Sequence, residues 1–460
     1  MRYLPLFLLF IGLPTLAEDD LDLELDLPEE RVEKEAKKKK KKKPEPAKPW
    51  RIESTEFTME LRQFADDDDD ETFENQRAFK ARIHAEKELG GGLLKAIVSA
   101  RYDDQDPNRN LFWPEDLNYS KLLASKYNFQ VGYKIFNFSN MDAFNPLDTI
   151  NARIFDVSIV NAEKMGELAL GVSAEKLGGY LSFYFLPNPT RPVLPGSNSR
   201  INLDTNLDTA IWMGSKDDEP NWDDHFLISW EGMFGDWDAT IVITKGIDRT
   251  RAIVGTDDYN ITLDNAIPNG TKFNTPYFFE RYLTGVNLVG PIGDDLLKLS
   301  LSHSYYLSET EIFTAQQALE ESSDPDDLVT PSDFSTLAIG YERPLEMSGN
   351  LSSSLIAEYQ YQYYAGGENQ AGFPLANDIF LAWRLNFNDL NSKQLILSAM
   401  YDLEGNQEGF IQVDYSQRFM EVFKINAGIL EYMIPDDASF SGYGIFKDTE
   451  HAYLNITYYL

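Results

Sequence analysis

The sequence predicts an all-β fold, a transmembrane antiparallel up-and-down β-barrel of about 16 strands (range about 14–18). Three observations support this fold class. Apolar and polar residues alternate from about Arg51 to the end of the 460-residue chain. The alternating runs reach about 9–12 residues, the length of tilted membrane strands, whereas soluble sandwiches use strands of about 5–6 residues. Short turns and long polar stretches separate these runs.

The alternation places one apolar and one polar face on each strand, because successive side chains of a strand point to opposite sides. In the segment 79–86 (FKARIHAE), Phe79, Ala81 and Ile83 alternate with charged residues. In a barrel the apolar face meets lipid and the other face meets a wet lumen. The same pattern recurs at residues 57–62, 127–135, 237–243, 297–302 and 411–416.

The last nine residues form the most regular of these runs. The apolar phase comprises Ala452, Leu454, Ile456, Tyr458 and Leu460, and the polar or amphipathic phase comprises Tyr453, Asn455, Thr457 and Tyr459. We expect this segment to be the strand that closes the barrel.

The N-terminal segment is typical of a secretory signal. Its first two residues (MR) give a short positive region, and residues 3–14 (YLPLFLLFIGLP) form an apolar run that is too short to span a bilayer as a helix. We therefore expect residues 1–17 to be removed on export and the protein to reside in the bacterial outer membrane. No cysteine follows the signal, so a lipoprotein anchor is not expected.

Residues 18–50 differ in composition from the barrel segment, residues 51–460. The stretch 19–26 (DDLDLELD) alternates acid and leucine, and a lysine run and several prolines follow. Like charges repel and prolines stiffen the chain, so we expect an extended periplasmic tether. The alternative is a docking arm that binds anionic lipid or an acidic periplasmic partner. The candidate docking residues are Lys37, Lys38, Lys39, Lys40, Lys41, Lys42 and Lys43.

The composition restricts the class of partner. The net charge of −34 excludes a nucleic-acid binder and suits a barrel with acidic outer loops. The chain has no cysteine, so barrel closure must stabilise the fold without disulfides. Aromatic residues make up 13% of the chain and suit interfacial girdles. We expect outer-membrane lipid and lipopolysaccharide as partners.

The connections between the runs fall into two length classes. Short turns are expected at residues 90–92 (GGG), 177–179 (LGG) and 388–392, where Gly and Asn supply positive φ. At about 25 residues per strand with its loop, the segment after residue 50 gives about 16 strands. Long polar connections are expected at residues 103–118, 187–206, 246–276 and 310–332.

Two acidic clusters are candidate cation sites. One covers Asp66 to Glu71, and the other contains Asp324, Asp326 and Asp327. Neither has the glycine-punctuated spacing of a calcium loop. We interpret both as solvated loops, with Ca²⁺ or a divalent ion that bridges to lipopolysaccharide phosphates as the alternative. No other cofactor is expected.

The histidines give little support to an enzyme. His84, His225 and His451 fall on the polar phase of their strands, and His303 falls on the leucine phase between two serines. Neighbours in a strand point to opposite faces, so these serines cannot pair with His303 as nucleophile and base. The sequence also has no Gly-x-Ser-x-Gly elbow and no histidine spacing typical of metal sites. We therefore expect no enzymatic activity.

The most specific motif of the chain is a turn. Asn145 and Pro146 are turn initiators, and Asp142 and Asp148 can cap nearby backbone amides. The structural interpretation is a rigid turn or a constriction loop folded into the lumen. The functional interpretation is a lumen site where Asp142, Asn145 and Asp148 offer oxygen ligands to a substrate or cation.

The segment 132–148 (GYKIFNFSNMDAFNPLD) resembles an uncharacterised family of proteobacterial outer-membrane β-barrels. Members carry an Asp-x-Phe-Asn-Pro-x-Asp turn after a strand that ends in Trp-Gly, and later a Pro-rich loop. Here Phe138-Ser139 replaces Trp-Gly, and residues 184–187 (YFLP) precede the Pro-rich segment. Some members are associated with exporters of the resistance-nodulation-division (RND) type that move lipids or hydrophobes. The resemblance therefore implies an outer-membrane barrel with an RND-type or other periplasmic partner.

Three functions from different classes follow. The first is a porin-like outer-membrane channel for a small solute, whose acidic loops favour cations. The second is a non-conducting accessory barrel for lipid or hydrophobe transport, which works with a periplasmic or inner-membrane partner through residues 18–50. The third is an outer-membrane hydrolase. The sequence favours the channel.

Overall fold

A computed structural model describes most of the chain from residue 49 onward. The described residues are 49–65, 73–157, 162–193, 195–196, 198–201, 206–207, 225–249, 253–255, 273–277, 280–307, 332–347, 349–365, 376–404, 408–435, 443 and 446–460. The expected signal peptide, the lysine run 37–43 and both acidic clusters lie outside these residues.

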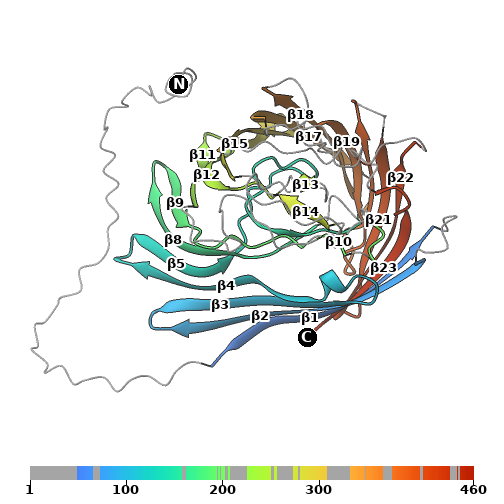
Figure 1. Ribbon diagram of the computed structural model, residues 1–460, viewed down its shortest axis with the longest axis horizontal. Coiled ribbons are helices and arrows are strands. Elements are labelled where there is room, and N and C mark those ends of the chain that lie inside the picture. The colour runs from blue at the N-terminus through green and yellow to red at the C-terminus, as the bar shows by residue number, and fades with distance from the viewer. Residues whose placement is uncertain are drawn as a thin grey trace, which may run out of the picture. The chain divides into compact units, whose positions relative to one another are not determined.

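An 18-stranded antiparallel sheet closes into a barrel (Figure 1). Its first nine strands are β1 (Arg51–Phe64), β2 (Asn75–Leu89), β3 (Gly92–Asp103), β4 (Leu111–Leu123), β5 (Tyr127–Lys134), β8 (Glu167–Lys176), β9 (Gly179–Phe185), β11 (Phe226–Phe234) and β12 (Trp237–Ile247). The other nine are β15 (Glu280–Ile292), β16 (Asp295–Tyr306), β17 (Phe334–Glu346), β18 (Ser352–Tyr364), β19 (Asn377–Asn386), β20 (Gln394–Asp402), β21 (Gly409–Phe419), β22 (Phe423–Met433) and β23 (His451–Tyr459).

The barrel closes where its first and last strands meet. β23 pairs antiparallel with β1, in a register that runs from Glu56↔Tyr459 to Phe64↔His451. At this seam the hydroxyl oxygens of Thr58 and Thr457 lie 2.9 Å apart. Closure lets every strand satisfy its backbone hydrogen bonds within the protein, which lipid cannot do. The all-β antiparallel barrel expected from the sequence is confirmed.

Several short elements lie outside the barrel sheet. β6 (Arg153–Ile154) pairs with β7 (Glu163–Lys164), and β14 (Phe273–Tyr277) pairs with β10 (Asn206–Leu207) and β13 (Ile253–Gly255). The 3-10 turn η2 (Pro107–Arg109) lies between β3 and β4. Among the described residues, no helix is long and apolar enough to cross a membrane.

The strand number is 18, which differs from the expected value of about 16 and lies at the upper end of the expected range of about 14–18. That value assumed about 25 residues for each strand with its connection. The hairpin turns at one end of the barrel use fewer residues than this estimate assumes. Leu177 and Gly178 join β8 to β9 with φ of 57° and 72°, a pair of positive values that matches the twist of a two-residue hairpin. Such turns use few residues and leave room for two more strands.

The expected long connection at residues 103–118 is wrong, because β4 begins at Leu111. Its polar residues suggested a loop, but they face the lumen. Asp116 forms an ion pair of 3.0 Å with Lys95 of β3, and Trp113 is buried. Pro114 lies where the register between β3 and β4 shifts, a place in a sheet that tolerates proline.

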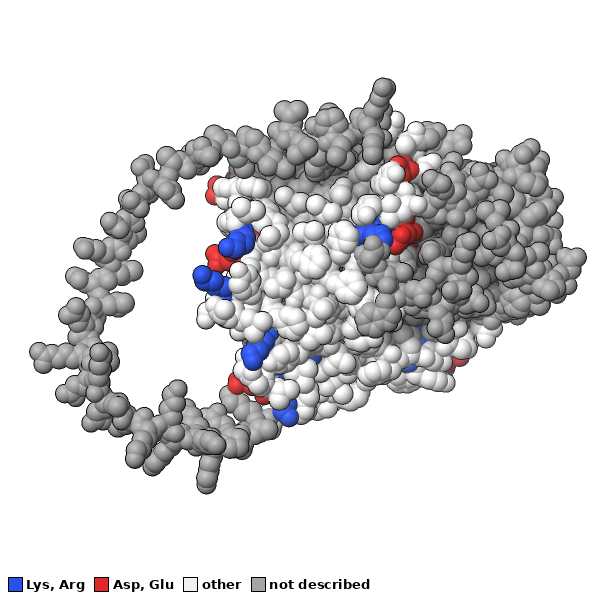
Figure 2. Space-filling view, turned by 60° about the vertical axis from the view of Figure 1, so that its left-hand side comes forward, with Lys and Arg blue, Asp and Glu red and all other residues white. Residues whose placement is uncertain are grey.

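The outer face of the barrel is apolar. Ile83, Leu301 and Leu381 point outward and are 42%, 48% and 51% exposed. Figure 2 shows one side of this face, with a band free of charged residues between groups of charged side chains. Exposed aromatic residues near the band's edges are Tyr102, Phe112, Tyr305 and Tyr363 at the long-loop end and Tyr127, Phe234 and Phe419 at the short-turn end. The protein is therefore located in the bacterial outer membrane. Outer-membrane barrels have their short turns in the periplasm, so we expect the short-turn end to be the periplasmic one.

Candidate functional site

The described residues of the connection between β5 and β8 fold into the barrel, and we call these residues, 135–157 and 162–166, the lumen insert. Figure 1 shows this teal segment within the ring of strands. Leu147 of the insert is fully buried and clusters with Leu227, Val242 and Leu283 on the lumen side of three strands. The neighbouring residue Ile243 points outward and is 40% exposed. The insert therefore occupies the lumen.

Two apolar clusters hold the lumen insert against different parts of the wall. The first joins Phe136, Phe138, Leu147 and Ile150 of the insert to Ala169, Tyr184, Leu186, Leu227, Val242 and Leu283. The second joins Met141, Phe144 and Val157 of the insert to Ala338, Ile356, Phe380, Ala382, Met400, Phe410, Leu430 and Tyr432. Burial of one large apolar side chain stabilises by about 1.5–3 kcal/mol, so the clusters anchor the insert on both sides.

The tip of the insert binds the wall through its backbone. Glu358 of β18 faces the lumen and is 1% exposed. Its carboxylate accepts hydrogen bonds from the backbone N–H groups of Asp142, Ala143 and Phe144, at 2.7, 2.9 and 3.2 Å. Consecutive N–H groups of this kind form a concave anion site. Glu358 therefore satisfies three donors that would otherwise be buried without partners.

The side chain of Asp142 extends this contact to neighbouring strands. One of its oxygens lies 3.0 Å from Lys298 Nζ of β16, and the other lies 2.5 Å from Arg384 Nη2 of β19. Glu342 of β17 lies 3.2 Å and 3.6 Å from the same two cations. The carboxylate oxygens of Asp142, which the sequence suggested as ligands for a solute or cation, thus form ion pairs with the barrel wall.

The other expected site residues stabilise the turn itself. Asn145 accepts two hydrogen bonds from preceding backbone N–H groups, at 3.2 and 3.1 Å, which fixes the turn that Pro146 continues. Asp148 pairs with Lys164 at 2.6 Å and with Arg153 at 3.1 Å, both within the insert. The structure therefore places all four expected residues in one turn inside the lumen.

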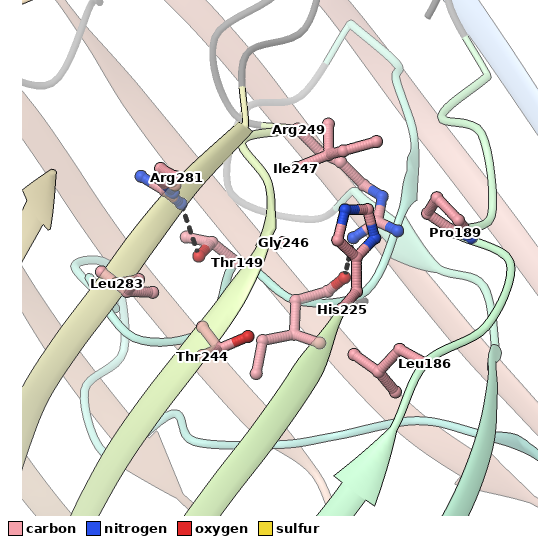
Figure 3. A pocket seen from close by; sticks show the side chains of 11 residues that line it. Thr149, Leu186, Pro189, His225, Thr244, Gly246, Ile247, Arg249, Arg281 and Leu283 are labelled. Carbon is pink, nitrogen blue, oxygen red and sulfur yellow. Dashed lines mark hydrogen bonds between the residues drawn. The ribbon is translucent and has the colours of Figure 1, made fainter. Parts of the chain in front are cut away.

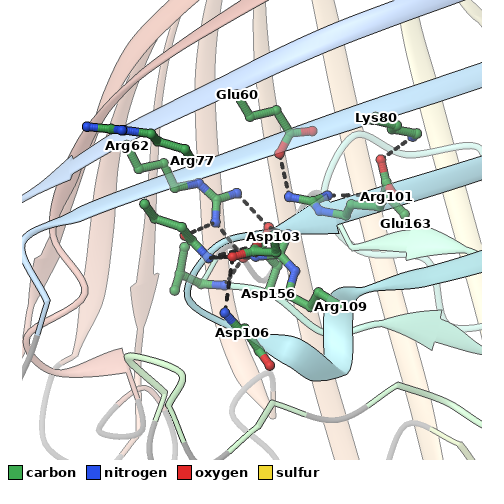
Figure 4. Close-up of polar contacts among 12 residues, drawn as sticks. Glu60, Arg62, Arg77, Lys80, Arg101, Asp103, Asp106, Arg109, Asp156 and Glu163 are labelled. Atoms are coloured by element: carbon green, nitrogen blue, oxygen red, sulfur yellow. Dashed lines mark hydrogen bonds and ion pairs between the residues drawn. The ribbon is translucent and has the colours of Figure 1, made fainter.

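A second polar anchor lies near the end of the insert (Figure 4). The Asp156 carboxylate accepts bidentate hydrogen bonds from two guanidinium groups. Arg62 of β1 donates at 2.7 and 2.6 Å, and Arg109 of η2 donates at 2.9 and 2.8 Å. The side chains of Arg62 and Asp156 are 13% and 15% exposed, and that of Arg109 is 4% exposed. Bidentate pairs shielded from water are strong. We call these three residues the Asp156 latch.

A neighbouring network adds a further attachment beside the latch, also visible in Figure 4. Glu163 of the insert accepts a hydrogen bond from Lys80 of β2. Arg101 of β3 donates to Glu60 of β1 and lies 3.9 Å from Glu163. The insert is thus tied to β1, β2 and β3 by charged groups, in contrast to its apolar packing elsewhere.

The Asp156 latch is expected to hold from about pH 8 down to about pH 4.5. Burial alone would raise the pKa of the Asp156 carboxyl, but Arg109 and Arg62 outweigh it and hold the pKa well below its usual value of 3.8. A carboxyl with a lowered folded-state pKa stabilises the fold above its unfolded pKa, and this stabilisation is lost only as the pH falls through the folded-state pKa.

This expectation is measured with spin labels on two introduced cysteines, one at Asn137 in the insert and one at Leu390 in a periplasmic turn. Samples are equilibrated at each pH before the distance between the labels is recorded. The distance should be constant over the range. A change between about pH 6 and pH 7 would contradict the latch and point to a histidine instead.

The insert also covers a small pocket against β11, β12 and β15 (Figure 3). Its volume is ≈ 20 Å³, enough for about one water molecule. Arg281 donates to the Thr149 hydroxyl at 2.9 Å, and Arg249 donates to the Ile150 carbonyl and, at 2.9 Å, to Glu167. The pocket is too small for a solute, so these contacts serve to anchor the insert.

Burial divides the lumen wall into two parts. Where the insert packs against β8–β19, lumen-facing polar residues are covered, as shown by exposures of 2% for Ser229, Ser302 and Thr336, whereas Glu231 nearer the short turns is exposed. On β21–β23 and β1–β4, lumen-facing side chains toward the periplasm are half-buried. We call this second part the polar wall, formed by Glu56, Thr58, Arg82, Glu115, Asp414, Asn426, Asn455 and Thr457. The side chains of the polar wall are therefore partly accessible to solvent.

Sequence reasoning missed the residues that anchor the insert. Asp156 and Glu358 are isolated acidic residues that belong to no sequence motif. Their partners in the fold are distant in the chain, so the sequence does not indicate these contacts. Glu358 does carry a weak signal, since it lies on the lumen phase of an otherwise aromatic and amide-rich strand, SSSLIAEYQYQYY. The polar wall was visible only as the polar phase common to all strands.

The described residues contain one histidine–serine pair that the sequence did not suggest. His303 Nδ1 lies 3.0 Å from Ser335 Oγ on the neighbouring strand β17. Both side chains lie on the outward phase, beside the exposed residues Leu301 and Leu337. Within the described part of the chain, no group of three or more His, Asp or Glu residues could hold a metal ion.

Comparison with known proteins gives solved structures only, since no family model and no curated protein matches the chain. OccAB1 of Acinetobacter baumannii has a TM-score of 0.48 at 10% identity, with 88% of this chain and 95% of that chain covered. A BenF-like porin from Pseudomonas fluorescens Pf-5 has a TM-score of 0.48 at 10% identity, covering 89% and 98%. A loop-deletion mutant of OmpT, an outer membrane protein of Vibrio cholerae, has a TM-score of 0.44 at 10% identity, covering 89% and 99%.

Proposed function

We propose that this protein is an outer-membrane channel through which a small solute passes along the polar wall. The supporting observation is the division of the lumen. The insert packs on strands from β8 to β22, whereas Asn455, Thr457 and the other residues of the polar wall, nearer the short turns, keep half-buried side chains that solvent reaches. Polar side chains beside water are the lining that lets barrels conduct hydrophilic solutes.

Single cysteines test the proposed path, because the chain has no other thiol. We expect the purified mature protein to give steady current steps in planar bilayers. A charged thiol reagent should reduce the current of the Asn455→Cys and Thr457→Cys variants, since these positions face the water-filled path. The matched controls are Leu454→Cys and Ile456→Cys, the alternate residues of the same strand, whose side chains face lipid.

The outcomes separate the channel from its alternative. A barrel that gives no current in planar bilayers would contradict the proposal. It would favour a non-conducting accessory barrel for lipid or hydrophobe transport that works with a periplasmic or RND-type partner. Current steps with equal block at Leu454 and Asn455 would keep the channel but contradict the path.

We propose transport rather than hydrolysis for the same barrel. The histidine–serine pair at His303 and Ser335 lies on the lipid-facing side, away from any aqueous substrate in the lumen. In the lumen, His84 lies 3.3 Å from Glu86, and His225 lies 3.0 Å from Glu280. These contacts fit ion-pair partners of the wall.

A further inference from the structure

Asp414 of β21 differs from the other carboxylates of the polar wall in its partners. It accepts a hydrogen bond of 2.7 Å from Gln412 Nε2 and another from the Tyr453 hydroxyl. Both donors are neutral, and among the described residues no Lys, Arg or His forms an ion pair with it.

Carboxylates in and beside the same wall have cationic partners instead. Glu56 and Glu115 lie 3.1 Å and 2.9 Å from Arg82. Asp116 lies 3.0 Å from Lys95. Among the described residues Asp414 has no cationic partner, so its negative charge acts on solvent and on solutes in the lumen.

The surroundings of Asp414 are built around this hydrogen-bonded arrangement. In the sheet register Asp414 pairs with Gly428 of β22, which in turn pairs with Tyr453 of β23. A Cβ atom on Gly428 would lie 2.4 Å from the Tyr453 hydroxyl oxygen. Glycine at this position therefore makes space for the tyrosine ring to cross the neighbouring strand and hold the carboxylate.

Asp414 also lies where a solute would meet it. Toward the outside, Phe410 on the same strand belongs to the cluster covered by the insert, and Tyr432 of β22 donates to the Val157 carbonyl at 2.8 Å. Gln412 is 6% exposed, and Asp414, the next lumen-facing residue, is half-buried. Asp414 thus marks the point where the covered wall ends and the polar wall begins.

The cations nearest along the sheet do not cancel this charge. Arg62 pairs with Tyr453 in the register of β1 and β23, but Asp156 holds both of its Nη atoms. Arg418 and Lys424 lie closer to the periplasmic rim, where bulk solvent screens charge. An uncompensated charge in a narrow, low-dielectric lumen concentrates counter-ions.

We propose that Asp414 makes the lumen selective for cations, so that the small solute carries a positive charge. This inference rests on the proposed channel function. Asp414 acts as a specificity-determining residue through its field, with Tyr453 and Gln412 as positioning residues.

The test is the reversal potential of the purified mature channel in a KCl gradient. We expect wild type to prefer potassium over chloride. Asp414→Asn should lower the permeability ratio by about tenfold, because a unit charge about 6 Å away in water favours potassium and disfavours chloride by about threefold each, and Asp414→Lys should invert the preference. Glu431→Gln is the matched control, because it removes the same charge from the outward phase of the neighbouring strand. Its ratio should equal that of wild type.

A further variant separates charge from structure. Tyr453→Phe removes a hydrogen bond but keeps the carboxylate, so it should remain cation-selective. A wild-type channel without cation preference, or a ratio unchanged by Asp414→Asn in a correctly folded barrel, would overturn the inference and leave the channel intact. Absence of any current would remove both the channel and this selectivity.

Discussion

Replacing Asp156 with asparagine is expected to release the end of the lumen insert from β1 and η2. The variant keeps the shape of the side chain but removes the charge that Arg62 and Arg109 share. Breaking a buried ion pair from one side costs about 3–5 kcal/mol. The lower end applies here, because Arg62 and Asp156 are 13% and 15% exposed. A cost of about 3 kcal/mol raises the population of the released insert by about 100-fold.

Limited proteolysis measures this population. Arg153 and Lys164 are trypsin sites within the insert, and the cleavage rate follows the open population when opening is fast. We expect cleavage at these sites about 100-fold faster in Asp156→Asn than in wild type. Asp389→Asn, in an exposed periplasmic turn, is the control for loss of one carboxylate and should behave as wild type.

A double variant tests whether the lost charge is the cause. Arg62→Gln combined with Asp156→Asn removes both partners of the closest pair, so its effect should be smaller than the sum of the single effects. If the insert of Asp156→Asn resists trypsin as well as wild type does, the other contacts of the insert hold it and the latch is dispensable.

The barrel was predictable from sequence because its signal is local. Alternation along residues 79–86 or 452–460 fixes which side chains face lipid, and each strand pairs with its neighbours in the chain. The strand number was less accessible, because it depends on how few residues each turn uses. Leu177 occupies a positive-φ turn position where Asn or Gly is usual, so this turn's length could not be read from its composition alone.

The insert shows where sequence reasoning ends. The turn at Asn145 and Pro146 was visible because its hydrogen bonds lie within a few residues. Its attachment was not, since Asp142 and its acceptor Glu358 are separated by 216 positions. A loop packed inside a barrel follows no period, so the sequence does not indicate which wall it contacts. The division into a covered wall and a polar wall depends on those contacts.

Replacing Glu358 with alanine is expected to detach the tip of the insert. The N–H groups of Asp142, Ala143 and Phe144 lose their common acceptor. A buried donor without a partner costs about 1–3 kcal/mol, and water that enters the vacated space can satisfy some of the three. We expect a net cost of about 3 kcal/mol, with the ion pairs of Asp142 to Lys298 and Arg384 retained.

Hydrogen exchange reports this change directly. The amide protons of residues 142–144 should exchange about 100-fold faster in Glu358→Ala, because the opening free energy falls by about 3 kcal/mol. In Glu358→Gln the exchange rate of these amides should lie between the rates in wild type and in Glu358→Ala. The glutamine amide oxygen can still accept a hydrogen bond, but its NH₂ group faces the same N–H donors. The control Glu346→Gln removes one exposed carboxylate at the end of β17. Unchanged exchange at residues 142–144 in a folded Glu358→Ala barrel would show that this carboxylate does not hold the tip.

The two anchors should act independently. Glu358 and the Asp156 latch have no residue in common and attach to different strands, β18 in one case and β1 with η2 in the other. Free-energy changes at sites without shared partners usually add to within about 0.5 kcal/mol. Asp156→Asn combined with Glu358→Ala should therefore give a protease sensitivity near the product of the single effects, with the insert held by its apolar clusters and the remaining polar contacts. A combined effect no larger than that of either variant would mean that each end of the insert opens separately.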